Sequence, residues 1–254
     1  MVLIMRRLIF ISLLLATLAS LSACSVLKAS PAPDTGFLPN PERLSEMRER
    51  APFHASWFLM DGRYAALKEN YTKIHVRPIE TGYLRDQYRK ADLPDGYRTQ
   101  RIEELTEVAR FLEGSLKLSL EQYPDAKLEV VDQPGPGVFV LELARAELTP
   151  TDPTINTIGT AAGFFVPGGG LIKRVGQGSI AIEGIVRDGE TGEVLEQFRD
   201  READKSSAFS VKDFQQYAHA RESIVDWAEQ LAELANTPLD HKVEDSLPFS
   251  LSVL

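Results

Sequence analysis

The 254-residue chain is predicted to be an α+β protein in which two long amphipathic helices pack on one face of a mostly antiparallel sheet. Several short segments alternate apolar and polar residues, which is the period of a strand. Two longer segments repeat apolar residues every three or four positions, which is the period of a helix. An apolar, glycine-rich insertion separates two of the strands. The strands are expected at residues 73–79, 127–132, 138–147, 179–187 and 194–199.

The helices and turns follow from local signals. Apolar residues at helical spacing predict a helix over residues 102–120, and a second helix is expected over residues 210–237, before Pro238. The segment 53–59 is rich in aromatic residues and is expected to be extended. Residues 188–192 contain two glycines, which suit the positive φ angles of a hairpin turn. The five strands and two helices are expected to form a single α+β domain over residues 41–237.

The start of the chain carries a targeting signal. Arg6 and Arg7 precede an apolar core over residues 8–21, which is too short to span a bilayer. Leu21-Ser22-Ala23-Cys24 follows directly and predicts cleavage between Ala23 and Cys24, so residues 1–23 are a signal peptide. This tetrapeptide resembles the lipobox of bacterial lipoproteins, and a plain signal peptide followed by an incidental cysteine is the alternative.

The lipobox resemblance implies that the sulfur of Cys24 carries a diacylglycerol. Two or more acyl chains, at about 0.8 kcal/mol per buried methylene, anchor a protein stably to a membrane. Ser25 follows the cysteine. In this class of lipoproteins a residue other than Asp at that position implies the outer membrane. We expect the protein to face the periplasm, with exposure on the cell surface as the alternative. The membrane is therefore one expected partner, through the lipid on Cys24.

Composition agrees with an exported domain. Without residues 1–23 the chain keeps 26 basic and 37 acidic side chains, a formal net charge of −11, which argues against nucleic acid as a partner. Cys24 is the only cysteine, so no disulfide is expected. Residues 24–40 contain three prolines and are predicted to be a flexible tether, with a short helix over residues 41–47 behind it. Residues 238–254 are expected to be a loosely attached tail.

The glycine-rich insertion is the first candidate for activity. Residues 158–172 are too few for a membrane-spanning helix, which needs roughly 20 residues, and Pro167 and three glycines also break a helix. Three interpretations stay open: a capping loop, a flap that contacts a partner or lipid, and a hairpin contributed to an oligomeric pore. Long glycine-rich loops are often functional. The candidate contact residues are Ile158, Phe164, Phe165, Val166, Leu171 and Ile172.

Catalytic and cofactor motifs are not found in the sequence. The four histidines, at positions 54, 75, 219 and 241, are far apart and outside any hydrolase or zinc motif. The run 168–174 lacks the Gly-Lys-Ser/Thr of a nucleotide-binding loop. We therefore expect no metal, cofactor or nucleotide, and a protein that is not an enzyme. An envelope hydrolase is kept as a residual alternative.

Several segments in order resemble the DUF3313 family of bacterial lipoproteins, over about residues 24–235. They are the lipobox, Gly36-Phe37-Leu38, the strand at 73–78, the turn at 133–138, the segment 149–156 and the hairpin at 188–195. The resemblance implies class and location, and it implies no activity. We predict a binding or scaffolding module for an unknown envelope protein. An oligomeric export channel is the alternative, because the order of elements is similar to that of curli-export lipoproteins.

Overall fold

The computed structural model describes residues 31–32, 34–45, 50–59, 68–149, 178–203 and 217–246. The predicted lipidation and cleavage positions, Cys24 and Ala23, and all six candidate contact residues of the insertion lie outside these ranges. Within the described part, no helix is long and apolar enough to cross a membrane. The ordered elements are η1 (Pro41–Arg43), β1 (Ala55–Phe58), β2 (Lys73–Val76), α3 (Gly82–Lys90), α4 (Asp95–Gln122), β3 (Glu129–Val130), β4 (Val138–Thr149), β5 (Ser179–Asp188), β6 (Val194–Ala203) and α6 (Ala218–Asn236).

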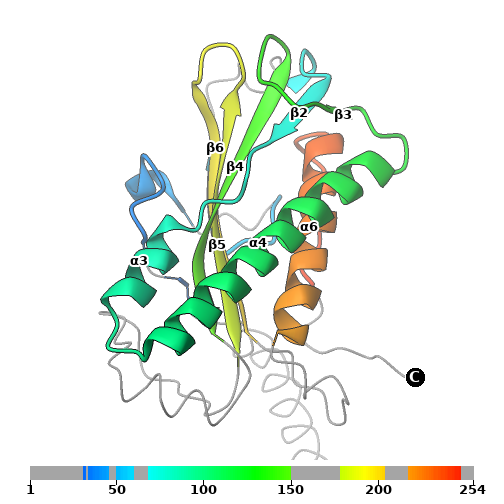
Figure 1. Ribbon diagram of the computed structural model, residues 1–254. Helices are drawn as coiled ribbons and strands as arrows, with labels where there is room; N and C mark the ends of the chain where they lie inside the picture. The colour runs from blue at the N-terminus through cyan, green and yellow to red at the C-terminus, as the bar shows by residue number, and fades with distance from the viewer. Residues whose placement is uncertain are drawn as a thin grey trace, which may run out of the picture.

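The α+β class is confirmed, but the sheet is mixed rather than mostly antiparallel. Its six strands lie in the order β1-β6-β5-β4-β2-β3 (Figure 1). The pairs β1–β6, β6–β5 and β5–β4 are antiparallel, whereas β4–β2 and β2–β3 are parallel. The cause is the crossover: α3 and α4 carry the chain back along the sheet, so β3 and β4 start in the same direction as β2. Residues 133–137 therefore do not join neighbouring strands.

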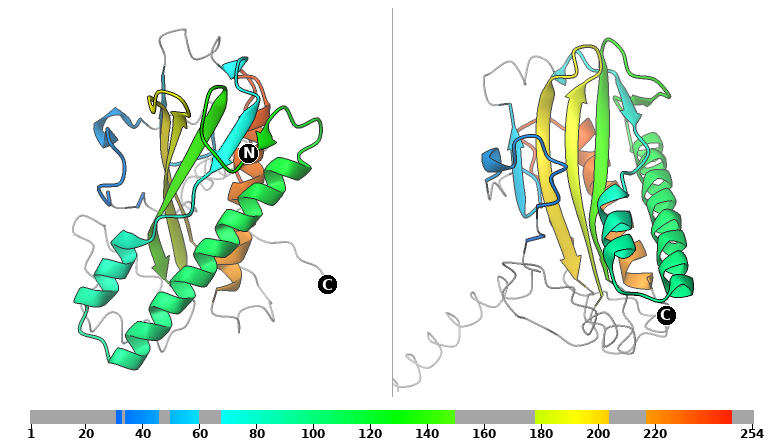
Figure 2. Two further views of the ribbon diagram at one scale, coloured as in Figure 1. Left: turned by 45° about the horizontal axis from the view of Figure 1, so that its top comes forward. Right: turned by 60° about the vertical axis from the view of Figure 1, so that its left-hand side comes forward.

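Helices α3, α4 and α6 cover one face of the sheet (Figure 2). The two predicted long helices correspond to α4, which begins at Asp95, and α6, whose predicted start at residues 210–216 lies outside the described residues. Helix α3 was not predicted, because only two of its side chains, Leu84 and Tyr88, are buried. The core side of α4 is an unbroken apolar line of Leu105, Val108, Leu112, Leu116 and Leu120.

The opposite face of the sheet is covered by the segment that leads from the predicted lipid anchor. Ala32 packs in one cluster with Ala146 of β4 and Ala181 of β5. The Thr35 hydroxyl donates to Glu183, which is fully buried. The prediction of a flexible tether is therefore wrong for this part of the segment. Just after it, η1 is a single 3₁₀ turn at the start of the helix expected over 41–47. Residues 46 and 47 of that helix lie outside the described part.

The segment after α6 is attached to the domain as far as it is described. Val243 is 1% exposed, and its N–H donates to the carbonyl of Arg50 at 2.8 Å. The amide of Gln230 on α6 donates to the carbonyl of Glu244 at 3.4 Å. The predicted loose tail is therefore wrong up to this point, and residues 247–254 lie outside the described part.

The two ends of the sheet are built differently. At the first, which we call the closed end, β5 and β6 meet in a tight turn in which Gly192 has φ 75°. Gly189 is needed for space rather than for φ, because an added Cβ would lie 2.7 Å from the carbonyl oxygens of Gly135 and Val138. The opposite end, which we call the insertion end, is where Thr149 of β4 pairs with Ser179 of β5 around residues 150–178.

Candidate functional site

A buried polar cluster lies at the insertion end, between the sheet and the helices. We call it the arginine–tyrosine cluster; its members are Tyr88 of α3, Tyr97, Arg101 and Glu104 of α4, Arg145 of β4 and Tyr217, which precedes α6. Arg101 occupies the buried side of α4, one turn before Leu105. Arg145 points to the helices because strand alternation places it on the same face as Leu141 and Leu143.

Arg101 is buried with its charge balanced. The side chain is 3% exposed, and its Nη1 lies 2.8 Å from Oε2 of Glu104. The same nitrogen donates to the Tyr217 hydroxyl, which in turn donates to Glu104 Oε2 at 2.8 Å. The guanidinium also lies 4.7 Å from the ring centre of Tyr97. This arrangement pairs the buried cation with one anion, one hydroxyl and one aromatic face.

Arg145 has no such compensation among the described residues. The side chain is fully buried, and its one hydrogen bond runs from Nη1 to the carbonyl of Leu105, at 3.4 Å. Within the described part of the chain, Nε and Nη2 have no hydrogen-bond partner. Burial lowers the pKa of Arg145 to about 10, so the group stays charged at neutral pH. A buried, unpaired charge costs several kcal/mol, so Arg145 stands out as a site for an anion.

The tyrosines of the cluster supply neutral hydroxyl groups. The hydroxyl of Tyr88 donates to the carbonyl of Leu148 at 3.3 Å. Burial raises the pKa of both Tyr88 and Tyr217, so neither ionises near neutral pH. Among the described residues, the cluster therefore holds two cations, Arg101 and Arg145, and one carboxylate, that of Glu104.

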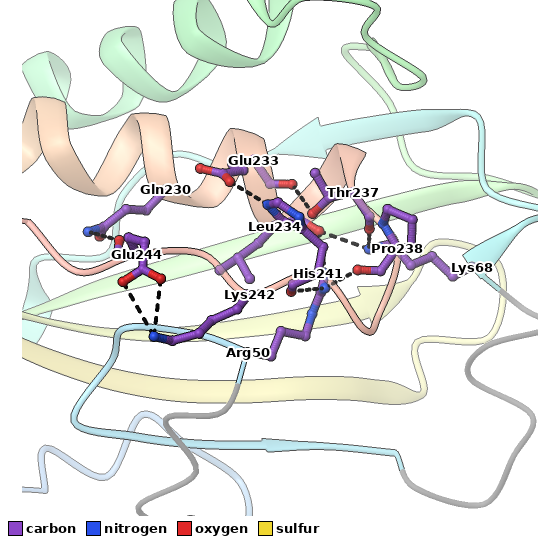
Figure 3. Close-up of polar contacts among 10 residues, drawn as sticks. All are labelled: Arg50, Lys68, Gln230, Glu233, Leu234, Thr237, Pro238, His241, Lys242 and Glu244. Carbon is purple, nitrogen blue, oxygen red and sulfur yellow. Dashed lines mark hydrogen bonds and ion pairs between the residues drawn. The ribbon is translucent and has the colours of Figure 1, made fainter.

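At the closed end, Arg50 and Lys68 donate hydrogen bonds to backbone carbonyls (Figure 3). Arg50 donates to the carbonyls of Leu234, at 2.6 Å, of His241, at 3.2 Å, and of Pro238. Lys68 donates to the carbonyls of Leu234 at 2.8 Å and Thr237 at 2.5 Å. These carbonyls belong to the last turn of α6 and the segment after it, where no helical N–H reaches them.

The four histidines lie on different elements and bind different partners. His54, before β1, is buried with Nδ1 2.5 Å from Oδ1 of Asp200, whose Oδ2 accepts from Trp227 at 2.8 Å. His75 contacts the carbonyl of Val131 and His241 contacts Glu233, while His219 is buried at the start of α6. Among the residues that the structure describes, no group of three or more His, Cys, Asp or Glu side chains could hold a metal ion.

Sequence reasoning did not single out Arg145. Its signal was present, because residues 138–147 were predicted as a strand and alternation places Arg145 on the face of Leu143. A charged side chain at an inward position of a strand is the observation that could have identified it. The candidate residues that the sequence did single out belong to the insertion. It follows Thr149, which lies four residues beyond Arg145, and it ends directly before Ser179.

Three comparisons relate the chain to known proteins. No curated protein matches its sequence. In fold it is similar to a PelC dodecamer from Paraburkholderia phytofirmans (12% identity, 66% of this chain and 90% of that one, TM-score 0.34). It is also similar to a minor lipoprotein from Acinetobacter baumannii (15%, 65% and 93%, 0.33) and a putative lipoprotein from Caulobacter crescentus CB15 (10%, 67% and 93%, 0.29). The profile of DUF3313, described as a protein of unknown function, matches residues 45–231, so the chain belongs to the DUF3313 family.

Proposed function

We propose that the chain is a lipid-anchored protein of the outer membrane, facing the periplasm, and that it acts as a non-enzymatic binding or scaffolding module. The lipobox-like Leu21-Ser22-Ala23-Cys24 supports the anchor. The arginine–tyrosine cluster supports binding, because it has an excess buried positive charge next to the insertion.

The observation that carries this proposal is the docking of the N-terminal segment onto the sheet. Ala32, which is buried on the sheet, comes only eight residues after Cys24. An extended chain spans at most about 3.5 Å per residue, so the link reaches about 28 Å. A lipid on Cys24 would therefore keep the domain close to the bilayer, and its partner would be a component at or near that surface.

The anchor is tested by labelling cells with a palmitate analogue. The wild type and Ser30→Ala, which changes the link but keeps the lipobox, are expected to be labelled and to fractionate with membranes. Cys24→Ser is expected to lose both the label and the membrane association. Label that persists in Cys24→Ser would contradict the lipid anchor.

Docking of the segment is tested separately by hydrogen exchange of residues 31–45. Ala32→Glu places a charge against Ala146 and Ala181, so exchange in this segment is expected to rise by tenfold or more. Glu42→Asp is the control, because Glu42 is exposed and the substitution keeps the charge. Unchanged exchange in Ala32→Glu would show that the segment does not hold the domain near the membrane.

The partner is sought by photo-crosslinking in intact cells. Crosslinkers at Phe164 and Phe165, in the insertion, are expected to capture an envelope protein, whereas one at the exposed Leu118 of α4 serves as the control. Capture from all three positions alike would contradict a specific role for the insertion. Light scattering of the detergent-extracted protein separates the export-channel alternative, because a channel requires a large closed ring.

A further inference from the structure

We propose that Arg145 binds a two-oxygen anionic group, a carboxylate or a phosphate, of a ligand that enters at the insertion end. This inference rests on the proposed binding function and specifies the chemistry that the domain recognises. It is carried by one edge of a fully buried guanidinium, which has no hydrogen-bond partner among the described residues.

The two unpartnered atoms of Arg145 form a matched pair of donors. Nε and Nη2 lie on the same edge of the planar guanidinium, and their N–H bonds are parallel. Two parallel donors of this kind fit the two oxygens of a carboxylate or phosphate in a bidentate contact. The remaining nitrogen, Nη1, already contacts the carbonyl of Leu105. The free edge is therefore the part of the side chain suited to an anion.

No carboxylate of the described residues supplies that anion to Arg145. Glu104 is engaged by Arg101 and by the Tyr217 hydroxyl. Among the described residues, the interactions that raise the pKa of Arg145 come from Tyr88 and Tyr217, both neutral near pH 7. One bound monoanion would balance the excess positive charge in the described part of the cluster. Without one, a buried guanidinium is less favourable than an apolar side chain of similar length.

The position of the cluster indicates the route of entry. Arg145 lies four residues before the end of β4, and Tyr217 lies one residue before α6. The cluster is therefore next to the points where residues 150–178 and 204–216 join the domain. Because Arg145 is fully buried, a ligand needs a local opening of the cluster, and bound ligand should slow hydrogen exchange there.

The experiment follows thermal unfolding of the detergent-solubilised, lipidated protein. Inorganic phosphate and acetate are the probes, with chloride at equal ionic strength as the reference. One of the probes is expected to raise Tm in a saturable manner, by about 5 °C at a hundredfold excess over Kd. Arg145→Met should abolish this rise, whereas Arg110→Met, at an exposed position of α4, should keep it. Phosphate and acetate distinguish the two sources of the anion.

Three results would overturn the proposal. The first is an unchanged Tm of the wild type in both anions. The second is a rise that persists in Arg145→Met, which would place the anion elsewhere. The third is a loss of stability in anion-free Arg145→Met that disappears in an Asp152→Asn, Asp204→Asn or Asp213→Asn background, because the chain's own carboxylate would then be the counterion.

The outcome is independent of the lipid anchor. Cys24→Ser protein should lose the palmitate label and keep the anion-dependent rise in Tm. Failure of anion binding would leave the crosslinks from Phe164 and Phe165 unaffected, so the proposed partner and the proposed ligand can fail separately.

Discussion

The closed end and the insertion end of the same sheet use buried cations in different ways. At the closed end, Arg50 and Lys68 donate to carbonyls of the last turn of α6 and of the segment behind it. At the insertion end, Arg145 is more deeply buried and keeps its two-donor edge without a partner among the described residues. Donors that cap a helix are part of the fold. Buried donors that have no partner among the described residues, such as Nε and Nη2 of Arg145, are suited to a ligand.

The loops at the two ends show the same contrast. The β5–β6 turn is short and is held by Asp188, which accepts from the N–H of Thr191 at 2.6 Å and from the Tyr71 hydroxyl. The β4–β5 connection at the other end extends over residues 150–178, although its two flanking residues are paired. Loop closure becomes only slightly more costly with length. A long insertion can therefore be carried at this end without weakening the sheet.

The same substitution should have opposite effects at the two ends. Arg50→Met removes one donor from each of the carbonyls of Leu234, Pro238 and His241. Leu234 keeps Lys68 and Pro238 keeps the N–H of His241. We expect a loss of about 3 kcal/mol in the free energy of unfolding. Arg145→Met removes an unpaired buried charge, and in anion-free buffer we expect no loss or a gain of about 1 kcal/mol. Both changes in the free energy of unfolding are measured by urea unfolding, with each substitution made in Cys24→Ser protein.

Equal losses in the two variants would remove the distinction between the ends. In that case Arg145 would be paired in solution, and the contrast between a capping cation and a ligand-binding cation would no longer hold. Arg110→Met, which changes an exposed arginine, sets the baseline and should stay within about 0.5 kcal/mol of the parent protein.

Adding a single methyl group at the closed end should lower the free energy of unfolding more than removing the insertion at the other end. In Gly189→Ala the new Cβ meets two carbonyl oxygens at 2.7 Å, and we expect a loss of about 2 kcal/mol. Deleting residues 158–172 leaves the pair Thr149 and Ser179 in place and should change the free energy of unfolding by less than about 1 kcal/mol. Thermal unfolding compares the two. A deletion that prevents folding would show that the insertion is part of the core.

Within the arginine–tyrosine cluster, a smaller effect is expected from the balanced arginine. Tyr217→Phe removes the hydroxyl between Arg101 and Glu104, while their direct contact at 2.8 Å remains. We expect a loss of about 1 kcal/mol in urea unfolding. Tyr97→Phe keeps the aromatic face under Arg101 and serves as the control. A loss as large as that of Arg50→Met would mean that the hydroxyl, rather than Glu104, holds the buried charge.

The sequence was informative where local periodicity decides the structure. The apolar line of α4 and the hairpin of β5 and β6 were predicted because each shows its own period. The parallel placement of β2 beside β4 depends on the crossover through α3 and α4, which periodicity does not encode. The packing of the segment around Ala32 was missed because a composition of small residues and prolines fits a flexible tether as well as a segment that packs on a sheet. Arg145 was missed because only the assembled cluster shows that no described neighbour binds Nε and Nη2 of its side chain.

A further effect is expected from pH at the closed end. Burial, with the nearby charges of Arg50 and Lys127, lowers the pKa of Lys68 from 10.5 to about 7. Between these values the unfolded chain binds more protons than the folded protein, so this group makes stability rise as pH increases from 7 towards 10.

Lys68→Met should flatten that rise, and Lys90→Met, at an exposed position of α3, should not. Urea midpoints measured from pH 6 to 10 compare the two variants, and parallel curves would show that Lys68 keeps an ordinary pKa in the folded protein. A neutral amine can still donate to Leu234 and Thr237, so the cap at the closed end does not depend on charge. Arg145, whose pKa stays near 10, remains a cation over most of this range. The insertion end should therefore keep its attraction for an anion under conditions in which the closed end has lost one of its charges.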